Sequence, residues 1–282
     1  MRRNIFLFLL FLVLGVCNAD AVGRHALIFG LGKQKDTSWG KINGDKDVLY
    51  VEKMLKAMKF TDVRSLVNEK ATKSEMVKAF HELAGRCKKG DIVYVHYSGH
   101  GQLMSDLDGD ESKKWQGKSY SQWDESWVPY DAYMNYCDKD RGEKHLSDDE
   151  IAVLLAEIRS KIGVNGQMTV VVDACHSGDA TCGEEEECVR GVDVKFIIPA
   201  KTTAKKESTP VKENWLTISA CKPFQLAMEM KNIQVGKLTY ALFSLGSKAF
   251  SMTNAELEKS LVNYMEINKG RMPQTPVVSG KK

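Results

Sequence analysis

The sequence predicts an α/β protein whose central sheet is mostly parallel and covered by helices on both faces. Two observations support this fold class. Apolar runs of strand length alternate along the chain with longer segments whose apolar residues recur at helical spacing. In addition, a Ser or Thr followed three residues later by Glu marks the start of three helices. Strands that alternate with helices form parallel sheets, and strands this apolar are buried on both faces.

The first half of the chain supplies three strands and two helices in alternation. RHALIFGLG, from Arg24, predicts a buried strand, and the apolar spacing over 45–59 predicts a helix. DVRSLV, from Asp62, is the second expected strand. A capping box over 72–75 opens the next helix, and DIVYVHYS, from Asp91, is the third strand.

The second half continues the same alternation. The capping box at 147–150 predicts a helix that ends near Lys161. QMTVVVDA, from Gln167, and NWLTISA, from Asn214, are the fourth and fifth expected strands. A last capping box over 253–256 opens the final helix.

Two long polar segments, 102–144 and 179–213, interrupt this alternation. Loops of such length are usually functional or mobile. Neither has the composition of a linker between two cores, and 282 residues with 43% hydrophobic residues suffice for one large core. We therefore expect one domain, over 24–280.

The N-terminus has the layout of a secretory signal peptide. Two arginines precede an unbroken apolar run over 5–16, which is shorter than a membrane span requires. We predict a signal peptide over 1–19, or over 1–21, and hence export to the periplasm or the extracellular space. Two alternatives stay open: a lipoprotein anchored at Cys17, which is the one way in which we expect a membrane partner, and an uncleaved anchor.

The charge and the cysteines exclude some classes of partner. The chain has 40 basic and 37 acidic residues, and loss of the leader with its two arginines would leave a nearly neutral protein. The sequence also has no basic or aromatic-basic stripe. Nucleic acid is therefore not expected as a partner. The cysteine spacing does not match a zinc site. In an exported protein Cys182 and Cys188 could close a small loop, although spacing alone does not establish the pairing.

Chemically active residues follow the third and fourth strands directly. GDIVYVHYSGHG ends in His100 and Gly101, and TVVVDACHSG carries Asp173 and Cys175. Sites in parallel sheets form beyond the carboxyl ends of the strands. If these two strands are neighbours, about 5 Å apart, His100 and Cys175 face one groove.

These residue types together predict acyl transfer. A cysteine attacks as its thiolate, and a nearby histidine can take the thiol proton and later protonate the leaving amine. Backbone N–H groups of a Gly-rich turn can stabilise the oxyanion. A lone buried cysteine or histidine is more often structural, but the two at adjoining strand ends, each beside Ser and Gly, favour catalysis.

HYSGHG and DACHSG, in this order, resemble the two catalytic motifs of the caspase-like cysteine peptidases, in particular the metacaspase branch. Further stretches agree: INGDKDV, ATKSEMVKAF, WVPYD, LSDDEI, TISACKPFQLAME, GKLTYAL and PQTPVVSG. The resemblance covers 24–280. It implies a caspase-like three-layer α/β/α sandwich, with His100 as the base and Cys175 as the nucleophile. It also implies that the backbones of Gly101 and Cys175 bind the oxyanion.

The resemblance further implies a specificity. Peptidases of the metacaspase type cut after Arg or Lys and have an acidic S1 pocket. Carried over by motif, that pocket would use Asp47, Ser98 and Asp173. Asp173 could instead cap amides at its strand end, but a cationic substrate needs such acids. The expected partners are peptides or proteins with Arg or Lys at P1.

A calcium site is an open alternative. Asp131 of PYD and the pair Asp148 and Asp149 of SDDE match metacaspase calcium sites, but a further Asp expected past the nucleophile has no clear counterpart. Asp148 and Asp149 also suit a helix N-terminus without metal. The chemistry itself requires no metal or organic cofactor.

Three functions remain in competition. The first is an exported cysteine endopeptidase that forms an acyl-enzyme and cuts after Arg or Lys. The second is a caspase-fold binding protein whose site is occluded or inert. The third is a transpeptidase that uses the same dyad and passes the acyl group to an amine.

The segment 179–213 also predicts self-cleavage, because an enzyme with an acidic S1 pocket would meet its own cationic residues there at high effective concentration. The candidates are Arg190, Lys195, Lys201, Lys205, Lys206 and Lys212. We expect the cut after Lys205 or Lys206. The alternative is that these residues only keep a surface loop soluble.

Overall fold

A six-stranded sheet forms the centre of the computed structural model, which describes residues 21–109, 114–115, 118–119, 123–176, 188–199, 211–270 and 272–281. Its strands are β1 (Arg24–Gly30), β2 (Asp62–Val67), β3 (Ile92–Ser98), β9 (Gln167–Asp173), β10 (Leu216–Ser219) and β13 (Val277–Gly280). The spatial order is β13-β10-β9-β3-β1-β2. All neighbours are parallel except β13, which is antiparallel to β10. The expected mostly parallel sheet is confirmed.

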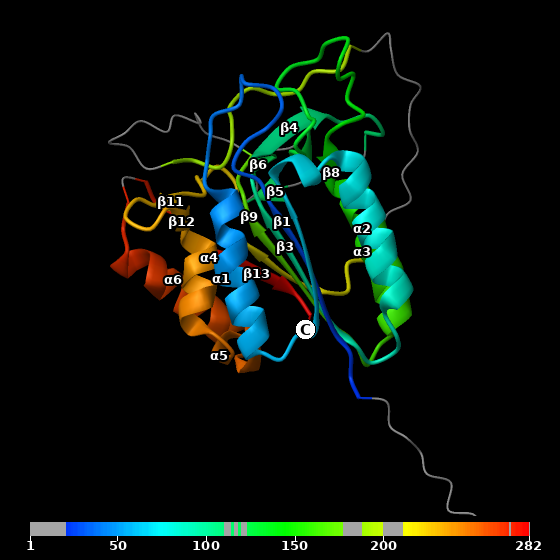
Figure 1. Cartoon of the computed structure of the whole chain (residues 1–282). Coiled ribbons are helices and arrows are strands. Elements are labelled where there is room, and N and C mark those ends of the chain that lie inside the picture. The colour runs from blue at the N-terminus through cyan, green and yellow to red at the C-terminus, as the bar shows by residue number, and fades with distance from the viewer. Residues whose placement is uncertain are drawn as a thin grey trace, which may run out of the picture.

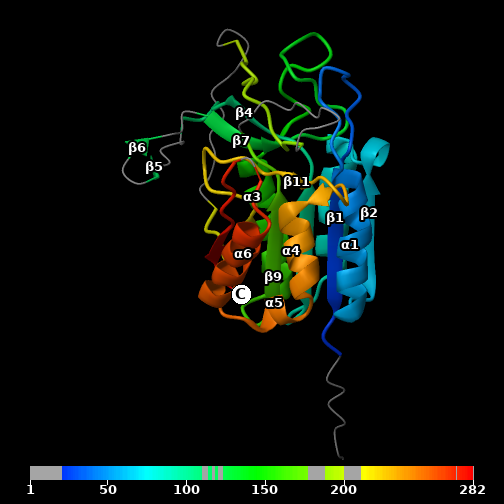
Figure 2. The same ribbon diagram turned by 90° about the vertical axis from the view of Figure 1, so that its left-hand side faces the viewer.

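Helices cover both faces of this sheet (Figure 1). On one face α1, α4 and α6 lie side by side, with the short α5 beside them (Figure 2). Their bounds are Gly44–Ala57, Lys237–Leu245, Asn254–Ile267 and, for α5, Lys248–Ser251. The other face carries α2 (Lys73–Arg86) and α3 (Asp148–Ile162), and a single 3-10 turn, η1 (Asn68–Lys70), precedes α2. The fold is therefore the expected three-layer α/β/α sandwich.

The predicted capping residues start three of these helices. Ser147 and Thr253 form complete capping boxes with Glu150 and Glu256. Thr72 accepts a hydrogen bond from the Glu75 N–H at the start of α2. Each side chain satisfies a backbone N–H that the first turn of a helix leaves unpaired.

Two apolar cores stabilise the sandwich, one on each face of the sheet. Residues such as Leu27, Phe80 and Leu155 form the core under α2 and α3, and Ile28, Leu55 and Leu242 belong to the core under α1, α4 and α6. Alternate residues of each strand point to opposite faces, which is why neighbours such as Leu27 and Ile28 belong to different cores.

Short strands lie beyond the carboxyl ends of the central sheet. β4 (Gly101–Ser105), β7 (Trp123–Trp127) and β8 (Leu146–Ser147) form an antiparallel sheet, and β5 (Lys114–Trp115) pairs with β6 (Lys118–Ser119). β11 (Glu229–Met230) pairs with β12 (Val235–Gly236). The sequence gives no clear strand pattern in 102–144, because these strands are short and polar. Their effect is to hold the chain that follows His100 above the central sheet.

The predicted signal peptide lies outside the described residues, so export stays a prediction. Within the described ranges, none of the helices is both long and apolar enough to cross a bilayer.

Candidate active site

The register of the central sheet brings the two chemically active strand ends together. β3 and β9 are parallel neighbours, with Ser98 opposite Asp173, and His100 and Cys175 each follow two residues later. A side chain on Gly101 would approach the Cys175 carbonyl oxygen to 2.5 Å, so this contact requires a glycine. Cys175 carries a thiol rather than a disulfide and is buried, with 2% of its surface exposed.

The His100 ring is buried and neutral, and a hydrogen bond fixes its tautomer. Its Nε2 lies 2.7 Å from the Gly40 carbonyl oxygen, which can only accept, so Nε2 carries the hydrogen and Nδ1 is the basic nitrogen. Nδ1 is buried and has no hydrogen-bond partner among the described residues. Burial lowers the pKa of His100 to about 4, and the ring packs 5.2 Å from that of Trp39. At neutral pH the His100 imidazole is therefore unprotonated, and Nδ1 is its proton-accepting atom.

Two backbone N–H groups converge on one oxygen atom. The N–H of Cys175 and the N–H of Gly101 both donate to the Arg190 carbonyl oxygen, at 2.9 and 3.3 Å. Two convergent donors of this kind are the arrangement that binds an oxyanion. These are the two residues to which the family resemblance assigns that role.

The Arg190 side chain fills a pocket lined by three carboxylates: Asp47, Asp173 and Glu229, called here the acidic pocket. The guanidinium donates to both oxygens of Asp47, at 2.6 Å from Nη1 and 3.1 Å from Nη2. Its Nε donates to Glu229 at 3.1 Å, and Nη1 lies 3.4 Å from Asp173. The Arg190 side chain is 0% exposed. Such paired, planar contacts fit a guanidinium specifically.

Glu229 is the member of the acidic pocket that sequence reasoning missed. It lies in TISACKPFQLAME, one of the stretches that resemble the family, but far along the chain from the two strand ends that carry His100 and Cys175. The available signal was a single acid between Met228 and Met230, which predicts a buried carboxylate that needs a partner. Asn43 provides additional hydrogen bonds to Glu229, from its backbone and its side-chain amide.

The remaining contacts fix the carboxylates in place. The Ser98 hydroxyl donates to Asp47 at 2.7 Å, so Ser98 orients an acid and does not itself contact Arg190. At the start of α4, the N–H and the hydroxyl of Thr239 donate to Asp173, at 2.8 and 2.7 Å, and Gly236 N–H donates to Asp47 at 3.0 Å. The positive end of the α4 dipole thus faces the acidic pocket.

The charges in the pocket shift one another's pKa values. Burial alone would raise the pKa of Asp47, but the Arg190 guanidinium and several hydrogen bonds lower it below the usual range. Burial raises the pKa of Asp173 to about 6, against the opposing effect of Arg190. The pKa of Arg190 is raised well above its usual value, since its three carboxylate neighbours outweigh its burial. The site is therefore built around a permanent cation.

The chain around Arg190 runs as an added strand. The Arg190 N–H donates to the Ala227 carbonyl at 2.9 Å, and the Glu229 N–H donates to the Cys188 carbonyl at 3.0 Å. Val189 and Met228 form the antiparallel bridge between these bonds. Extended peptides bind to sheet edges in this way.

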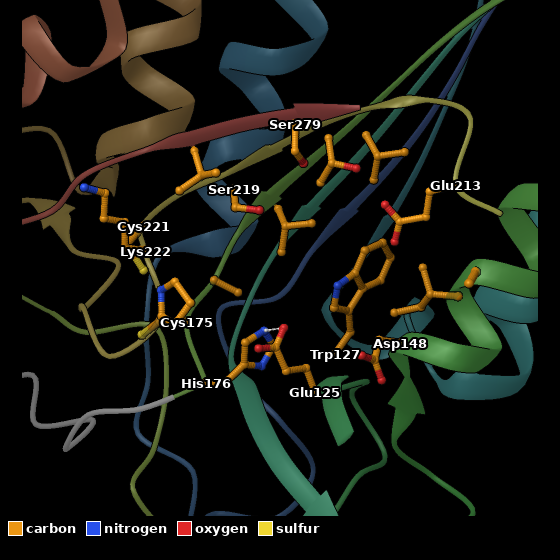
Figure 3. A pocket seen from close by; sticks show the side chains of 18 of the residues that line it. Glu125, Trp127, Asp148, Cys175, His176, Glu213, Ser219, Cys221, Lys222 and Ser279 are labelled. Atoms are coloured by element: carbon orange, nitrogen blue, oxygen red, sulfur yellow. Dashed lines mark ion pairs between the residues drawn. The ribbon is translucent and has the colours of Figure 1, made fainter. Parts of the chain in front are cut away.

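A separate cavity of about 450 Å³ lies beside Cys175 and His176. Figure 3 shows these two residues across the cavity from Glu213, with the ion pair of His176 and Glu125 at 3.4 Å between Nε2 and Oε2. Apolar side chains of β9 and α3 and polar side chains of β10 line further parts of it. The acidic pocket is not part of this cavity, because Arg190 fills it.

The predicted calcium ligands are not gathered at one point. Asp131 accepts a hydrogen bond from the Lys73 N–H at 2.9 Å, Asp148 lines the cavity of Figure 3, and Asp149 lines a second cavity. Within the described ranges, no group of three or more His, Cys, Asp or Glu side chains could hold a metal ion. Calcium binding by Asp131, Asp148 and Asp149 stays an untested prediction.

Two other expectations fall partly outside the described residues. Lys205 and Lys206, the expected cleavage positions, lie outside them, as does Cys182. Cys188 is disulfide-bonded, and the second cysteine of that bond is not among the described residues.

Comparisons with known proteins identify the family. A family model described as the caspase domain matches residues 23–281. Metacaspase-1 of Eremothecium gossypii is 35% identical over 176 residues, which are 62% of this chain and 31% of that protein. Metacaspase-1A of Aspergillus oryzae is 29% identical over 165 residues, which are 56% of this chain and 35% of that protein. The chain spans about a third of the length of these curated relatives.

Solved structures show the same fold. Protein GSU0716 from Geobacter sulfurreducens matches with a TM-score of 0.62 and 22% identity, over 92% of this chain and 94% of that one. Caspase-1 from Spodoptera frugiperda matches with a TM-score of 0.58 and 12% identity, over 92% of this chain and 86% of that one. At these identities the likeness establishes the architecture alone.

Proposed function

This chain belongs to the caspase-domain family of cysteine peptidases, and on that premise we propose that it is an endopeptidase that cuts after arginine or lysine through a Cys175–His100 dyad. The observation that carries the proposal is the binding of Arg190. A cationic side chain lies in an acidic pocket while its own carbonyl oxygen accepts from the Cys175 and Gly101 N–H groups. A P1 residue has to meet both conditions at once.

The proposed chemistry uses groups with assigned roles. Nδ1 of His100 takes the thiol proton of Cys175, and the thiolate attacks the P1 carbonyl carbon. The N–H groups of Cys175 and Gly101 stabilise the oxyanion, and His100 returns the proton to the leaving amine. Water then attacks the thioester, with His100 again as the base. The Gly40 carbonyl keeps the imidazole in the tautomer that this sequence of steps needs.

The specificity follows from charge and shape. Asp47, Asp173 and Glu229 surround the guanidinium of Arg190, so the pocket is suited to a cation. An aspartate at P1 would be repelled there. Substrates are therefore expected to be peptides or proteins with a cationic P1 residue.

The test is release of dye from peptide reporters that end in Arg, Lys or Asp, with and without calcium. Over a time course, the wild-type protein should cleave the Arg and Lys reporters and leave the Asp reporter intact. Cys175→Ala and His100→Ala should abolish cleavage and keep the circular dichroism spectrum. Undiminished turnover in Cys175→Ala would contradict the assignment of the nucleophile.

One rival function has a specific observation in its favour. A pocket filled by the chain itself is what an occluded, binding-only protein would contain. Inertness of the wild-type protein and of every variant toward the three reporters would favour that rival. If added amines are converted into amide products with the acyl group of the reporter, this would favour transpeptidation instead.

We also propose that the protein is exported, on the strength of its N-terminal sequence. The mature protein should begin at or near Asp20 or Val22. N-terminal sequencing of the protein from the medium or the periplasm, together with a test for lipid on Cys17, separates a cleaved leader from a lipid anchor.

A further inference from the structure

A column of polar side chains on β3 leads from the core to the acidic pocket. Tyr94, His96 and Ser98 alternate along this strand, so all three point to the face of the sheet that α1, α4 and α6 cover. His96 and Ser98 are 0% exposed. A buried imidazole is unfavourable in an apolar core unless it is hydrogen-bonded, so the partners of His96 define its role.

We propose that His96 is a positioning residue for the acidic pocket: it directs the hydroxyl hydrogens of Ser98 and Thr239 onto the carboxylates of the pocket. This inference rests on the proposed peptidase function and adds a residue that determines its specificity. The effect of His96 reaches the substrate through the two hydroxyls.

Two hydroxyl groups connect His96 to the pocket. Nε2 of His96 lies 3.0 Å from Oγ of Ser98 and 3.1 Å from Oγ1 of Thr239. The Ser98 hydroxyl lies 2.7 Å from Oδ2 of Asp47. The Thr239 hydroxyl lies 2.7 Å from Oδ2 of Asp173 and 3.0 Å from Oδ2 of Asp47. One nitrogen of His96 is therefore a single hydroxyl away from each of two carboxylates.

The hydrogen count determines the tautomer of His96. Ionised carboxylates only accept, and each hydroxyl has one hydrogen, which it gives to a carboxylate. Both hydroxyls can then only accept from His96, so Nε2 carries the hydrogen. Nδ1 is the acceptor, and the Tyr94 hydroxyl donates to it at 3.0 Å. We call these four side chains, Tyr94, His96, Ser98 and Thr239, the hydroxyl relay.

The opposite tautomer would take a hydrogen bond away from the pocket. An unprotonated Nε2 would accept the hydrogen of Ser98 or Thr239, and the oxygen left without it would face a carboxylate oxygen at 2.7 Å. Two lone pairs at this distance repel, so the carboxylate would turn or take up a proton. Asp173 depends most on the relay, because among the described residues its Oδ1 has no hydrogen-bond partner.

Burial keeps the hydroxyl relay neutral. It lowers the pKa of His96 to about 4, against the raising effect of Asp47, and it raises the pKa of Tyr94 well above its usual value. A protonated His96 would be a cation behind the carboxylates and would compete with the substrate for their charge. A neutral donor instead orients the carboxylates and leaves their charge for the substrate.

The hydroxyl relay matters most when no cation fills the pocket. Asp47 and Asp173 both lie close to Nη1 of Arg190, at 2.6 and 3.4 Å. Without a cation between them, two like charges this close repel, and one of them can take up a proton. Hydrogen bonds to the ionised carboxylates oppose this, and a donor behind each hydroxyl strengthens those bonds. The relay should therefore raise the affinity for a P1 cation.

The first experiment compares two replacements of His96. Arg190→Ala empties the pocket, and each protein is assayed with the Arg and Lys reporters. His96→Gln places an amide N–H near the position of Nε2, so its kcat/KM should stay within about threefold of that with His96. His96→Leu removes the donor, and kcat/KM for the Arg reporter should fall by roughly 10- to 100-fold, since two buried hydrogen bonds are lost. The Arg-to-Lys ratio should fall as well, because a planar guanidinium depends more strongly than an ammonium on where the carboxylates lie.

Two outcomes of this comparison would overturn the proposal. One is a His96→Gln protein as impaired as His96→Leu. The other is an equal loss for both reporters, which indicates a defect of the whole fold rather than of the pocket. His145→Gln and His145→Leu are the matched controls, since His145 is also a buried, neutral histidine, bonded at 2.7 Å to the Gln102 side chain. They should leave the Arg-to-Lys ratio unchanged.

Tyr94→Phe tests the far end of the hydroxyl relay. It keeps the ring, whose centroid lies 5.9 Å from that of His96, and removes the hydroxyl that donates to Nδ1. In the same Arg190→Ala background, kcat/KM for the Arg reporter should fall about three- to tenfold. The change should have no further effect in His96→Leu, because the relay is already broken there, and additive losses would contradict a shared relay. Tyr50→Phe, on α1, is the control and should leave kcat/KM unchanged.

Nitrogen NMR of the histidines tests the hydroxyl relay without turnover. In Cys175→Ala, with Arg190 in place, the His96 ring should carry its hydrogen on Nε2 from about pH 5 to 8. His96→Gln identifies the signal by its absence. A hydrogen on Nδ1, or protonation of the ring within this range, would overturn the proposal even if the Arg190→Ala proteins fail to fold.

Benzamidine binding separates failure of the relay from failure of the peptidase function. If none of the proteins cleaves a reporter, the peptidase function is wrong, and cation binding then decides whether the relay is correct. In the Cys175→Ala, Arg190→Ala double variant, benzamidine should raise the midpoint of thermal unfolding. Added His96→Leu should remove most of this shift, and added His96→Gln should keep it. Equal shifts in all three proteins would show that His96 does not position the pocket.

Discussion

Glu229 gives the acidic pocket a further acceptor, its Oε1 atom, and this changes which cations the pocket can distinguish. Asp47 engages the two terminal nitrogens of a guanidinium, and Glu229 engages Nε and Nη2. Lysine offers one compact ammonium and cannot fill both positions. The pocket is therefore expected to prefer arginine over lysine, which the family motifs alone do not predict.

Replacement of Glu229 by Gln should reduce this preference. A hydrogen bond to a charged group contributes about 1.5–3 kcal/mol, so kcat/KM for an Arg reporter should fall by roughly 10- to 100-fold. The Lys reporter should lose less. Parallel kinetics on Glu266→Gln, an exposed change on α6, provide the control. An unchanged Arg-to-Lys ratio in Glu229→Gln would contradict the assigned role.

The pH dependence of cleavage should report Asp173 rather than His100. The pKa of His100 is about 4, so the base is already neutral above that pH. The pKa of Asp173 is raised to about 6 by burial and by Asp47, against the lowering effect of Arg190. Below that pH Asp173 gains a proton and the pocket loses negative charge, so cleavage after Arg should rise with pH. Once Arg190 has left, the midpoint should lie at or above about 6.

The measurement is kcat/KM for the Arg reporter from pH 4.5 to 8, made on the self-cleaved protein or on Arg190→Ala. Asp173→Asn removes the titrating carboxylate, so it should be slower and should show a flatter acidic limb. Asp47 and Glu229 are the other acids facing the guanidinium. If the pH profile of Asp173→Asn has an acidic limb with the same midpoint, that limb belongs to Asp47 or Glu229 instead.

At the scale of elements, local signals predicted most of the sandwich. Capping residues and apolar periodicity indicated α2, α3 and α6, and apolar runs indicated β1, β3 and β9. Helix α4 lacks a side-chain cap, and its sequence was noted only for its resemblance to a family motif, so no helix was predicted there. The strands β4, β7 and β8 are too short and polar to show alternation.

The sequence indicated that His100 and Cys175 lie close together, and it indicated part of the acidic pocket, because these residues follow neighbouring strands in recognisable motifs. The position of Arg190 could not be predicted. Asp47 and Arg190 are 143 residues apart, and their contact depends on the packing of α1 against the chain that follows β9. Glu229 and Arg190 are likewise separated in the sequence, by 39 residues, and come into contact only when the chain folds. Long-range contacts of this kind leave no local pattern in a sequence.

The cap of α6 allows a test of stability alone. Thr253→Ala removes the hydroxyl that accepts from the Glu256 N–H and should lower the free energy of unfolding by about 1 kcal/mol. Thr253→Ser keeps the hydroxyl and should lose much less. Urea unfolding followed by fluorescence gives the difference. Reporter cleavage should not change, since α6 starts away from the acidic pocket.

At the scale of the whole molecule, the parts of the chain before and after the segment 179–213, in which the sequence predicts self-cleavage, are both needed for the site. Asp47 and Asp173 precede this segment, and Glu229 and Thr239 follow it. The two sides also share the central sheet, because β9 pairs with β10 across the cut. A cut chain thus keeps one continuous core.

The two fragments should accordingly stay together after cleavage. Size-exclusion chromatography of fully cut protein should give one peak at the elution volume of Cys175→Ala, and denaturant should split it into two species. Fragments that separate in native buffer would indicate that the sheet does not bridge the cut.

The seating of Arg190 in the acidic pocket has a consequence for timing. If the self-cleavage predicted for 179–213 takes place within one molecule, its rate needs no encounter with a neighbour. A dilute sample should then be cut with the same half-time as a concentrated one, with a single first-order rate constant.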